Sequence, residues 1–423
     1  MALAPTLARR RTFYGWYMVG IAAVSHLISS ALTTHASVVW VPSMTRELNW
    51  SRTDFFWVSS FGSVIQAILA VLLGPIVDRY GGRRVLIVGA LVAGAGTMLL
   101  SLVHSRWEFF ILRGVVMPTG ILTMGYIVVN VAVSNWFVRK RGRALAIAAM
   151  GLSAANIVLT PLAGIFITYL GWRLAWVALG LLVWLVLLPP TFLLMVRRPE
   201  DIGLKPDGDR APDTTATSRA PTTAEASFTR SQALRTPAFW LMTAAFSINF
   251  AAMGGMFSHF VPYLTGAPMN LSVLAATSVV SVGGWAAFLI KPPWGLLAER
   301  APARYLAAIG FLVMAAGILA ITFTRSLWAV YAAFMLWGVG MGSIVPVRDV
   351  AYANAFGRMN LGAIRGIETP FIVLASAGAP LFAARLFDVS GSYTSSFLIF
   401  AVLAGAPALL ILLAKPPKRS SGG

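Results

Sequence analysis

Residues 74–84 read Gly-Pro-Ile-Val-Asp-Arg-Tyr-Gly-Gly-Arg-Arg and lie where one uncharged stretch (55–77) ends and another (86–103) is about to begin. Each of these stretches has about the 20 residues that a helix needs to cross a bilayer. The glycines permit close helix contact and a tight turn, while Asp78 can pair with an arginine or lie at a helix N-terminus. The stretch therefore predicts a short charged loop that joins two membrane-spanning helices.

Uncharged stretches of the same kind recur along the whole chain. Of its 423 residues, 58% are apolar and 11% are charged, whereas soluble domains carry about 25% charged residues. The stretches cover residues 12–45, 55–77, 86–103, 114–138, 144–172, 174–196, 236–290, 305–324, 326–347, 369–384 and 389–414. Residues 236–290 are long enough for two spans, and the stretches lack the alternation of barrel strands. The sequence therefore predicts an all-α membrane protein with twelve transmembrane helices.

The positive charge of the chain has the distribution of a membrane protein and does not require nucleic acid. The formal net charge is +19, and most of the 33 Lys and Arg residues fall in cytoplasmic segments when both termini are placed in the cytoplasm. This is the positive-inside bias. The first span, from Thr12 onward, lacks the pattern of a removed signal peptide. We expect a multi-pass protein of the cell membrane (the inner membrane, if the source is bacterial) with both termini cytoplasmic.

The charged loop and its surroundings occur twice in the sequence. One set is echoed 221 positions later (295 − 74 = 221): Gly74, Asp78, Arg79 and Arg83 by Gly295, Glu299, Arg300 and Arg304. A second set is echoed 219 positions later (354 − 135 = 219): Asn135, Phe137, Arg139 and Pro161 by Asn354, Phe356, Arg358 and Pro380. Duplicated halves are how many transporters build a central site. We predict two pseudo-symmetric six-helix bundles, at 1–196 and 237–423, and a cytoplasmic linker at 197–236 that is disordered over 211–227.

Lys291 follows the longest uncharged run and is the main candidate for a substrate ligand. On a helix it shares a face with Ser281, Gly284 and Phe288. A lysine this deep in a span costs roughly 2.5–3.5 kcal/mol unless it faces a wet cavity or a partner. The two prolines after it leave backbone carbonyls unpaired and bend the helix. We expect an anion-binding site here; the alternative is a lysine that extends to the cytoplasmic surface near Glu299.

Other spans carry polar side chains that are expected to line the transport path. They are His26 in the first span, Tyr126 and Asn130 in the fourth, Asn249 and His259 in the seventh, and Ser281 in the eighth. At helical spacing such residues form stripes that face protein or water and not lipid. The alternative role of Tyr126 and Asn130 is packing between helices, and that of His259 is an interfacial position.

A further set of residues is assigned to gating and conformational switching. It consists of Gly74, Asp78, Arg79, Arg83, Arg113, Glu299, Arg348 and Asp349. Arg348, Asp349 and Glu368 fall in the inner third of the tenth and eleventh helices, where they can form an ion-pair cluster that closes the cytoplasmic gate. Glu368 is alternatively a protonatable coupling site, and His26 is a second candidate for carrying a proton.

Residues 74–84 resemble G-x-x-x-D-R-x-G-x-[RK]-[RK], the signature of the major facilitator superfamily between helices 2 and 3. Within that family, the chain resembles the branch of monocarboxylate transporters and oxalate:formate antiporters. The segments that carry this second resemblance are Phe13-Tyr-Gly-Trp, Gly171-Trp-Arg, Arg198-Pro-Glu-Asp-Ile-Gly-Leu-Lys-Pro, and Asn354-Ala-Phe-Gly-Arg with Gly362-Ala-Ile-Arg-Gly. The resemblance covers the whole chain and implies the twelve-helix fold of the family and transport by alternating access.

The resemblance also bears on the substrate. The branch places a basic residue in helix 8, four positions before the loop-signature glycine, where it holds the substrate carboxylate; Lys291 is four positions before Gly295. The oxalate/formate relatives have a second basic residue midway along helix 11, whereas residues 372–379 have none here. Animal monocarboxylate carriers have an aspartate where this chain has Ala287. One central cation favours a monocarboxylate over a dicarboxylate, and the usual proton-carrying aspartate is missing.

The sequence therefore predicts a secondary active transporter of a small organic anion, in the first place a monocarboxylate. Proton symport is the first hypothesis for its mechanism, and anion exchange of the oxalate/formate type is the second. Expected partners are the anion, a proton and the lipid bilayer, with no nucleic acid and with a monomer as the working unit. The absence of a Walker-type loop and of cysteine excludes ATP as the driving force and Cys-ligated metals. We expect no metal or cofactor.

Three other classes of membrane protein agree less well with the sequence. Proton-driven drug efflux requires a buried carboxylate in the cavity of helices 1, 4 and 5, whereas Asp54 falls at the outer end of helix 2. A non-transporting sensor or receptor would normally carry a cytoplasmic signalling domain, and the longest loop is linker-like. A membrane enzyme requires clustered catalytic groups, and the scattered His, Asp and Glu residues supply none, so the chain is predicted not to be an enzyme.

Overall fold

The computed structural model describes residues 13–35, 40, 43–44, 46–50, 52–208, 228–266, 269–271, 273–415 and 417. This part of the chain is helical and contains no strand. The segment 211–227, for which the sequence predicts disorder, lies outside the described residues, as does Asp54's side chain.

The helices follow the predicted order of spans. Those up to residue 208 are α2 (Gly15–Ser30), η1 (Ala31–His35), α4 (Arg52–Tyr80), α5 (Gly82–Leu99), η2 (Leu100–Leu102), α6 (Arg106–Ile111), η3 (Leu112–Val116), α7 (Met117–Met124), α8 (Tyr126–Trp136), α9 (Arg141–Leu194), η4 (Pro199–Ile202) and η5 (Pro206–Gly208). Those after residue 228 are α10 (Arg230–Leu234), α11 (Pro237–Thr265), α12 (Val273–Arg300), α13 (Ala303–Phe323), α14 (Leu327–Phe356), α15 (Leu361–Ser390), α16 (Thr394–Gly405) and α17 (Pro407–Leu413).

Eleven segments of the described residues are long and apolar enough to cross a membrane. Two of them, Arg141–Leu159 and Leu162–Leu194, lie in α9. The regular helix of α9 is interrupted at Gly171, a residue with φ 74° and ψ 162°. The positive φ is a conformation that glycine adopts without strain, so α9 supplies the predicted fifth and sixth spans. α12, with 28 residues, also has the length of a span. The all-α fold with twelve transmembrane helices is thereby confirmed.

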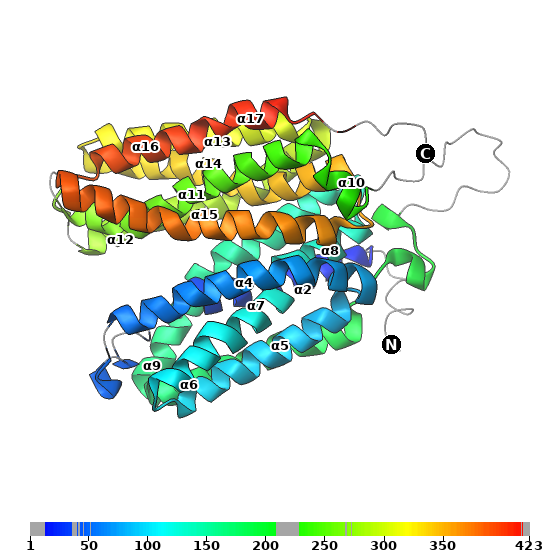
Figure 1. The fold of residues 1–423 in the computed structure, drawn as a ribbon, viewed down its shortest axis with the longest axis horizontal. Coiled ribbons are helices and arrows are strands. Elements are labelled where there is room, and N and C mark those ends of the chain that lie inside the picture. The colour runs from blue at the N-terminus through cyan, green and yellow to red at the C-terminus, as the bar shows by residue number, and fades with distance from the viewer. Residues whose placement is uncertain are drawn as a thin grey trace. The chain divides into compact units, whose positions relative to one another are not determined.

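Contacts divide the chain into two compact units. Unit 1 contains Met1–Ala233, Tyr352–Ile367 and Pro417–Gly423, and unit 2 contains Leu234–Ala351 and Glu368–Pro416. In unit 1, α5 packs against α7 and α9, and α2 packs against α8 and α9 (Figure 1). In unit 2, α13 packs against α16 and α17, and α11 packs against α12, α16 and α17 (Figure 1). The turn between α14 and α15 thus belongs to unit 1, although most of both helices belongs to unit 2.

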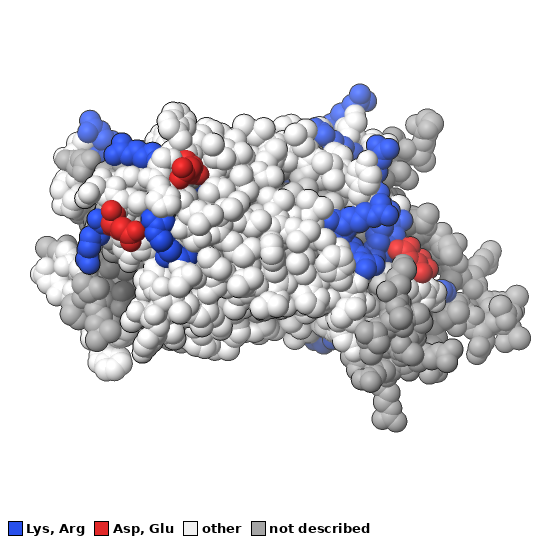
Figure 2. All heavy atoms as spheres, turned by 90° about the horizontal axis from the view of Figure 1, so that it is seen from below, with Lys and Arg blue, Asp and Glu red and all other residues white. Residues whose placement is uncertain are grey.

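On the visible surface, charged side chains lie toward the helix ends, as the sequence predicts for a membrane protein. Figure 2 shows Lys, Arg, Asp and Glu near the two ends of the visible face and uncharged atoms between them. Many large apolar side chains of the spans are exposed, among them Leu185 at 71% and Leu381 at 75%. Such exposure is costly in water and favourable against lipid, which agrees with a multi-pass membrane protein.

The Gly171-Trp-Arg segment connects the ends of several helices of unit 1. Arg173 forms an ion pair with Glu47 at 3.2 Å and lies over the ring of Trp172, 4.3 Å from its centre. Its Nη1 donates to the carbonyl oxygens of Ser101 at 2.7 Å and Val103 at 3.1 Å. A guanidinium has enough donors to serve all these acceptors at once, so this segment has a structural role.

Candidate functional site

Lys291 lies inside α12, and its side chain is 3% exposed. The helix continues through Pro292 and Pro293 to Arg300, although two proline rings remove two backbone donors. A buried ammonium is costly in an apolar helix unless an anion or a polar group compensates it. The structure therefore buries this lysine and does not place it at the surface near Glu299.

Close packing of α14 fixes the part of α12 that carries Lys291. A Cβ added to Gly342 of α14 would lie 2.8 Å from the carbonyl oxygen of Ala287, one turn before the lysine. One turn after it, the indole Nε1 of Trp294 donates to the carbonyl oxygen of Val339 at 3.1 Å. The backbone on both sides of Lys291 is thus held, which positions its ammonium group.

The face of α12 that carries Lys291 is open on its other turns. Ser281 is exposed, Phe288 is half-buried, and Lys291 is buried. A Cβ added to Gly284 would meet no atom within 4 Å, so there is free space beside this face. Lys291 therefore lies at the buried end of a helix face whose earlier turns, including Ser281, leave room for a small molecule or water.

A second group of charges is buried in unit 2, where α14 and α15 carry Arg348, Asp349 and Glu368. The Nε of Arg348 lies 3.6 Å from Oδ1 of Asp349 and 3.9 Å from Oε1 of Glu368, and the exposed fractions of the three residues are 4%, 2% and 0%. The guanidinium also faces the ring of Phe250, 5.1 Å from its centre. The structure thus brings together the three residues for which the sequence predicts an ion-pair cluster.

The two α11 residues that were predicted to line the path make contacts within unit 2. Asn249 is fully buried and its Nδ2 donates to the carbonyl oxygen of Ala404 at 3.0 Å, beside the break between α16 and α17. The Nε2 of His259 lies 3.0 Å from the carbonyl oxygen of Pro380, and its Nδ1 lies 3.3 Å from the hydroxyl of Tyr393. Both residues thus connect α11 to other helices of unit 2.

In unit 1, the first and fourth spans are joined by His26 and Asn130. The Nε2 of His26 lies 2.9 Å from Oδ1 of Asn130, and these side chains are 0% and 6% exposed. Just before them in the fourth span, Gly125 has an extended conformation (φ −81°, ψ −165°) that separates α7 from α8. The hydroxyl of Ser25 donates to the carbonyl of Met124 at this break. Non-helical backbone at membrane depth requires such polar partners.

We predict that His26→Leu lowers stability and that the loss depends on Asn130. Removing one partner of a buried hydrogen bond costs about 1–3 kcal/mol, because the other group stays buried without it. The double variant His26→Leu/Asn130→Leu should therefore lose less than the sum of the two single losses. Thermal unfolding of all four proteins in detergent measures this coupling. Strictly additive losses would show that the 2.9 Å contact contributes nothing.

Tyr126 and Arg113 occupy different positions in the same broken fourth span. Tyr126 is half-buried at the first turn of α8. Arg113 is 4% exposed and lies in the π-helix η3. It donates to the carbonyl oxygens of Leu32 at 3.0 Å and Thr33 at 3.4 Å in the first span. These contacts agree with the structural or gating role that the sequence favours for Arg113.

Asp78 binds the N-terminus of α15 through its side chain, one of the two possibilities that the sequence left open. Its carboxylate accepts from the backbone N–H groups of Gly362 at 3.3 Å and Ala363 at 2.8 Å. The first N–H groups of a helix lack partners within it and carry a partial positive charge, so they bind an anion. Gly74 permits this approach, because a Cβ there would lie 2.7 Å from the Cα of Ala363.

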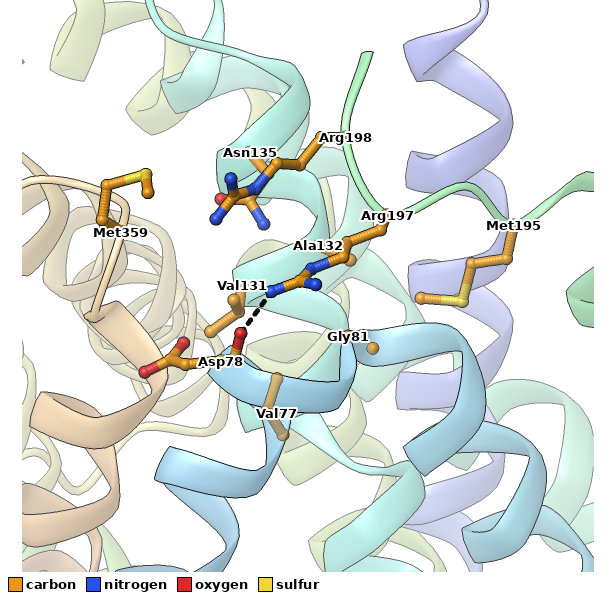
Figure 3. A pocket seen from close by; sticks show the side chains of 11 residues that line it. Val77, Asp78, Gly81, Val131, Ala132, Asn135, Met195, Arg197, Arg198 and Met359 are labelled. Carbon is orange, nitrogen blue, oxygen red and sulfur yellow. Dashed lines mark hydrogen bonds between the residues drawn. The ribbon is translucent and has the colours of Figure 1, made fainter. Parts of the chain in front are cut away.

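The remaining gating candidates lie around Asp78 and on α12. Figure 3 shows the pocket beside Asp78, where Arg197 reaches the backbone carbonyl of that residue. Arg83 donates to the carbonyl oxygen of Phe192 at 2.6 Å, and Arg79 is exposed with its guanidinium facing Tyr80. Glu299 is half-buried near the end of α12. Among the described residues no cluster of three or more His, Asp or Glu side chains is suited to a metal ion.

Two features of unit 1 were not predicted from the sequence. The break at Gly125 has no proline to mark it, and a single glycine inside an apolar run is common in membrane helices. Asp207 accepts hydrogen bonds from the backbone N–H groups of Val138 (3.1 Å), Arg139 (2.8 Å) and Lys140 (3.0 Å). The Pro-Asp-Gly sequence at 206–208 is a turn signal, but it does not reveal which distant segment the turn binds.

Comparison with known proteins gives one family. The family model described as Major Facilitator Superfamily matches residues 21–287 and 260–423. Monocarboxylate transporter 11 of Homo sapiens is 24% identical over 401 residues, which are 91% of this chain and 80% of the relative. The oxalate:formate antiporter of Oxalobacter formigenes is 24% identical over 358 residues, 81% of this chain and 78% of the relative. Both belong to the branch that the sequence resembles.

A solved structure shows the same fold. The human organic anion transporter MFSD10 (TETRAN) has a TM-score of 0.72 and 16% sequence identity, and the superposition covers 94% of this chain and 99% of that one. Family model, relatives and fold agree with the signature at 74–84 and with the twelve helices. The chain therefore belongs to the Major Facilitator Superfamily, and it is a multi-pass membrane transporter and not an enzyme.

Proposed function

We propose that this chain is a secondary active transporter of a small monocarboxylate that works by alternating access. The observation that carries the proposal is Lys291, a buried ammonium group on an otherwise uncharged helix face with free space about two turns away, at Gly284. A carboxylate bound there would compensate the lysine charge and leave the apolar part of the substrate against the apolar helices. Two relatives are transporters of monocarboxylates or of oxalate and formate by name, which supports an anionic substrate.

The charges buried in unit 2 support coupling to a proton. Lys291 and Arg348 carry two positive charges, and Asp349 and Glu368 carry two negative charges when ionised. A bound monocarboxylate adds one negative charge, and a proton on Glu368 restores neutrality. Because a net charge is costly in the apolar interior, anion and proton should move together. We propose symport on this basis, with Glu368 as the proton site.

The lining of the path is proposed to come from both halves of the chain, 1–196 and 237–423. His26, Tyr126 and Asn130 would contribute polar groups from the first half, and Ser281, Asn249 and His259 from the second. We further propose a monomer in the cell membrane with both termini in the cytoplasm, and residues 197–236 as the cytoplasmic connection between the halves.

The proposal is tested by uptake into proteoliposomes. We expect one of lactate, pyruvate, an aromatic carboxylate and oxalate, each labelled, to accumulate under an inward proton gradient, with a monocarboxylate preferred over oxalate. Collapse of the gradient by a protonophore should stop accumulation, and protein-free liposomes provide the background. Uptake that requires oxalate or formate inside the liposomes and does not depend on the proton gradient would establish anion exchange. No uptake of any carboxylate would overturn the proposal and direct the search to cationic and neutral compounds.

A further inference from the structure

Residues 195–208, here called the strap, follow α9 and lie on unit 1 without forming a long helix. They contain the short turns η4 and η5. Near its beginning, the carbonyl oxygen of Val196 accepts from the indole Nε1 of Trp136 at 3.1 Å, and Arg197 reaches the backbone carbonyl of Asp78. Figure 3 shows Arg197, Arg198 and Met195 around the pocket beside Asp78. The strap therefore contacts both the α4–α5 loop and the end of α8.

The other end of the strap is anchored by Asp207. Its carboxylate accepts from three consecutive backbone N–H groups of the turn between α8 and α9, at 138–140, over distances of 2.8–3.1 Å. Asp207 is 5% exposed and has a φ of 62°, a left-handed conformation that is unfavourable for most residues. Three charge-assisted hydrogen bonds from part-buried donors are strong enough to hold it. We regard this contact as the fixed end.

Between these ends, the strap binds the turn that joins α14 to α15, which is part of unit 1. Glu200 forms an ion pair with Arg358 at 3.2 Å, and these side chains are 47% and 19% exposed. The same guanidinium donates through Nη1 to the carbonyl oxygen of Asn135 at 2.8 Å. Arg358 therefore connects its own turn to the strap and to the end of α8.

The chain that returns after the linker binds the α14–α15 turn as well. The backbone N–H of Phe228 donates to the carbonyl oxygen of Phe356 at 2.9 Å, and its own carbonyl oxygen accepts from Nδ2 of Asn360 at 3.0 Å. The two aromatic rings meet edge to face with centres 5.9 Å apart. The segments on either side of 209–227 are thus docked on two different turns.

These two turns are the two copies of one duplicated sequence, Asn135-x-Phe137-x-Arg139 and Asn354-x-Phe356-x-Arg358. Asp207 holds the first copy, Phe228 holds the second, and Arg358 joins the two. Arg141 adds a contact, with its Nη1 3.3 Å from Oδ1 of Asn354. The chain therefore leaves the first copy of the turn at Gly208 and returns to the second copy at Phe228.

We propose that the strap is a releasable latch, with Asp207 as its permanent anchor and the Glu200–Arg358 pair as the contact that opens during transport. The proposal rests on the proposed transport by conformational change. α14 and α15 extend from the α14–α15 turn into unit 2, so that a movement of unit 2 would be transmitted to this turn. A half-exposed ion pair is weak enough to break in each cycle, whereas the buried Asp207 contacts are not.

The natural absence of cysteine makes the latch directly testable. Ala132 lines the pocket beside Asp78 and Met359 and is 5% exposed. In an Ala132→Cys background, a maleimide should react only when the region beside the α14–α15 turn opens. The initial labelling rate in detergent therefore reports the open population and requires no substrate.

We expect Glu200→Gln to raise the labelling rate of the Ala132→Cys protein about two- to five-fold, the effect of an exposed ion pair, and Arg358→Gln to raise it further. The matched control is Asp201→Asn, which changes an exposed carboxylate of the same strap that accepts from the nearby N–H of Arg198 at 3.2 Å, and it should leave the rate unchanged. Glu200→Arg combined with Arg358→Glu should label more slowly than Arg358→Glu alone.

Unchanged labelling in both Glu200→Gln and Arg358→Gln would overturn the latch, as would failure of the reversed pair to slow labelling. Asp207→Asn is expected to lower the unfolding temperature, unlike Glu200→Gln, and equal unfolding temperatures would refute its role as the anchor. These readouts do not use uptake. If no carboxylate is transported but Glu200→Gln and Arg358→Gln raise the labelling rate, only the proposed substrate is contradicted. If a carboxylate is transported but the labelling rate does not change in these variants, only the latch is contradicted.

Discussion

Lys291→Ala is expected to reduce carboxylate uptake by at least about 30-fold while the protein remains folded. Loss of one partner of a buried charge pair costs about 2–5 kcal/mol of binding free energy, and every 1.4 kcal/mol corresponds to a factor of ten. The fold should survive the substitution, because the backbone on both sides of Lys291 is held by the close packing of Gly342 and by the hydrogen bond of Trp294. Lys291→Arg keeps the charge and should retain part of the uptake, with a changed substrate preference because its guanidinium is planar and larger.

The control for this variant is Lys205→Ala, which removes an exposed lysine of the strap and should leave uptake at the wild-type level. Initial rates at several substrate concentrations separate the two possible effects of Lys291→Ala. A higher KM with the same maximal rate indicates lost binding, whereas a lower maximal rate indicates impaired conformational change. Uptake by Lys291→Ala at the wild-type rate would contradict the proposed binding site, and the lysine would then be a structural residue.

Arg348→Ala is expected to be the most destabilising single substitution in unit 2. It removes the guanidinium that lies 3.6 Å from Asp349 and 3.9 Å from Glu368, and two buried carboxylates then remain close to each other. Breaking a buried ion pair in this way costs about 3–5 kcal/mol. Protonation of a carboxylate would relieve part of the cost, so the variant should recover stability as the pH falls. Thermal unfolding between pH 5 and 8, compared with wild type, measures this recovery.

The companion substitution Glu368→Gln separates structure from coupling. It replaces the carboxylate with a neutral group of almost the same shape, so Arg348 keeps Asp349 and the fold should survive. If Glu368 carries the proton, uptake by this variant should no longer respond to the proton gradient, although exchange of labelled for unlabelled substrate should persist. An unchanged pH profile would instead leave Glu368 as a gate residue. The double variant Arg348→Ala/Glu368→Gln should be more stable than Arg348→Ala, because one buried charge fewer is left without compensation.

The sequence alone determined the fold class, the number of spans, the duplication and the family. These properties follow from transfer free energies summed along about 20 consecutive residues, from loop charges and from a local signature, none of which depends on how the helices are rotated. The sequence also predicted an anion-binding site at Lys291, because the residues from 236 to 290 that precede it carry no charge. It named the Arg348, Asp349 and Glu368 cluster because two short segments of neighbouring helices carry the charges.

Only the tertiary structure decided which partner each polar side chain has. Asp78 binds backbone N–H groups 284 and 285 residues away, and Asn249 bonds to a carbonyl 155 residues away. His26 and Ser281 show the same limit, because both lie on predicted polar stripes, yet one is fully buried and the other exposed. Hydrophobicity drives a segment into the membrane without fixing its rotation about the helix axis. The rotation is set by close packing at residues such as Gly342 and Gly74, and this packing selects which donor meets which acceptor.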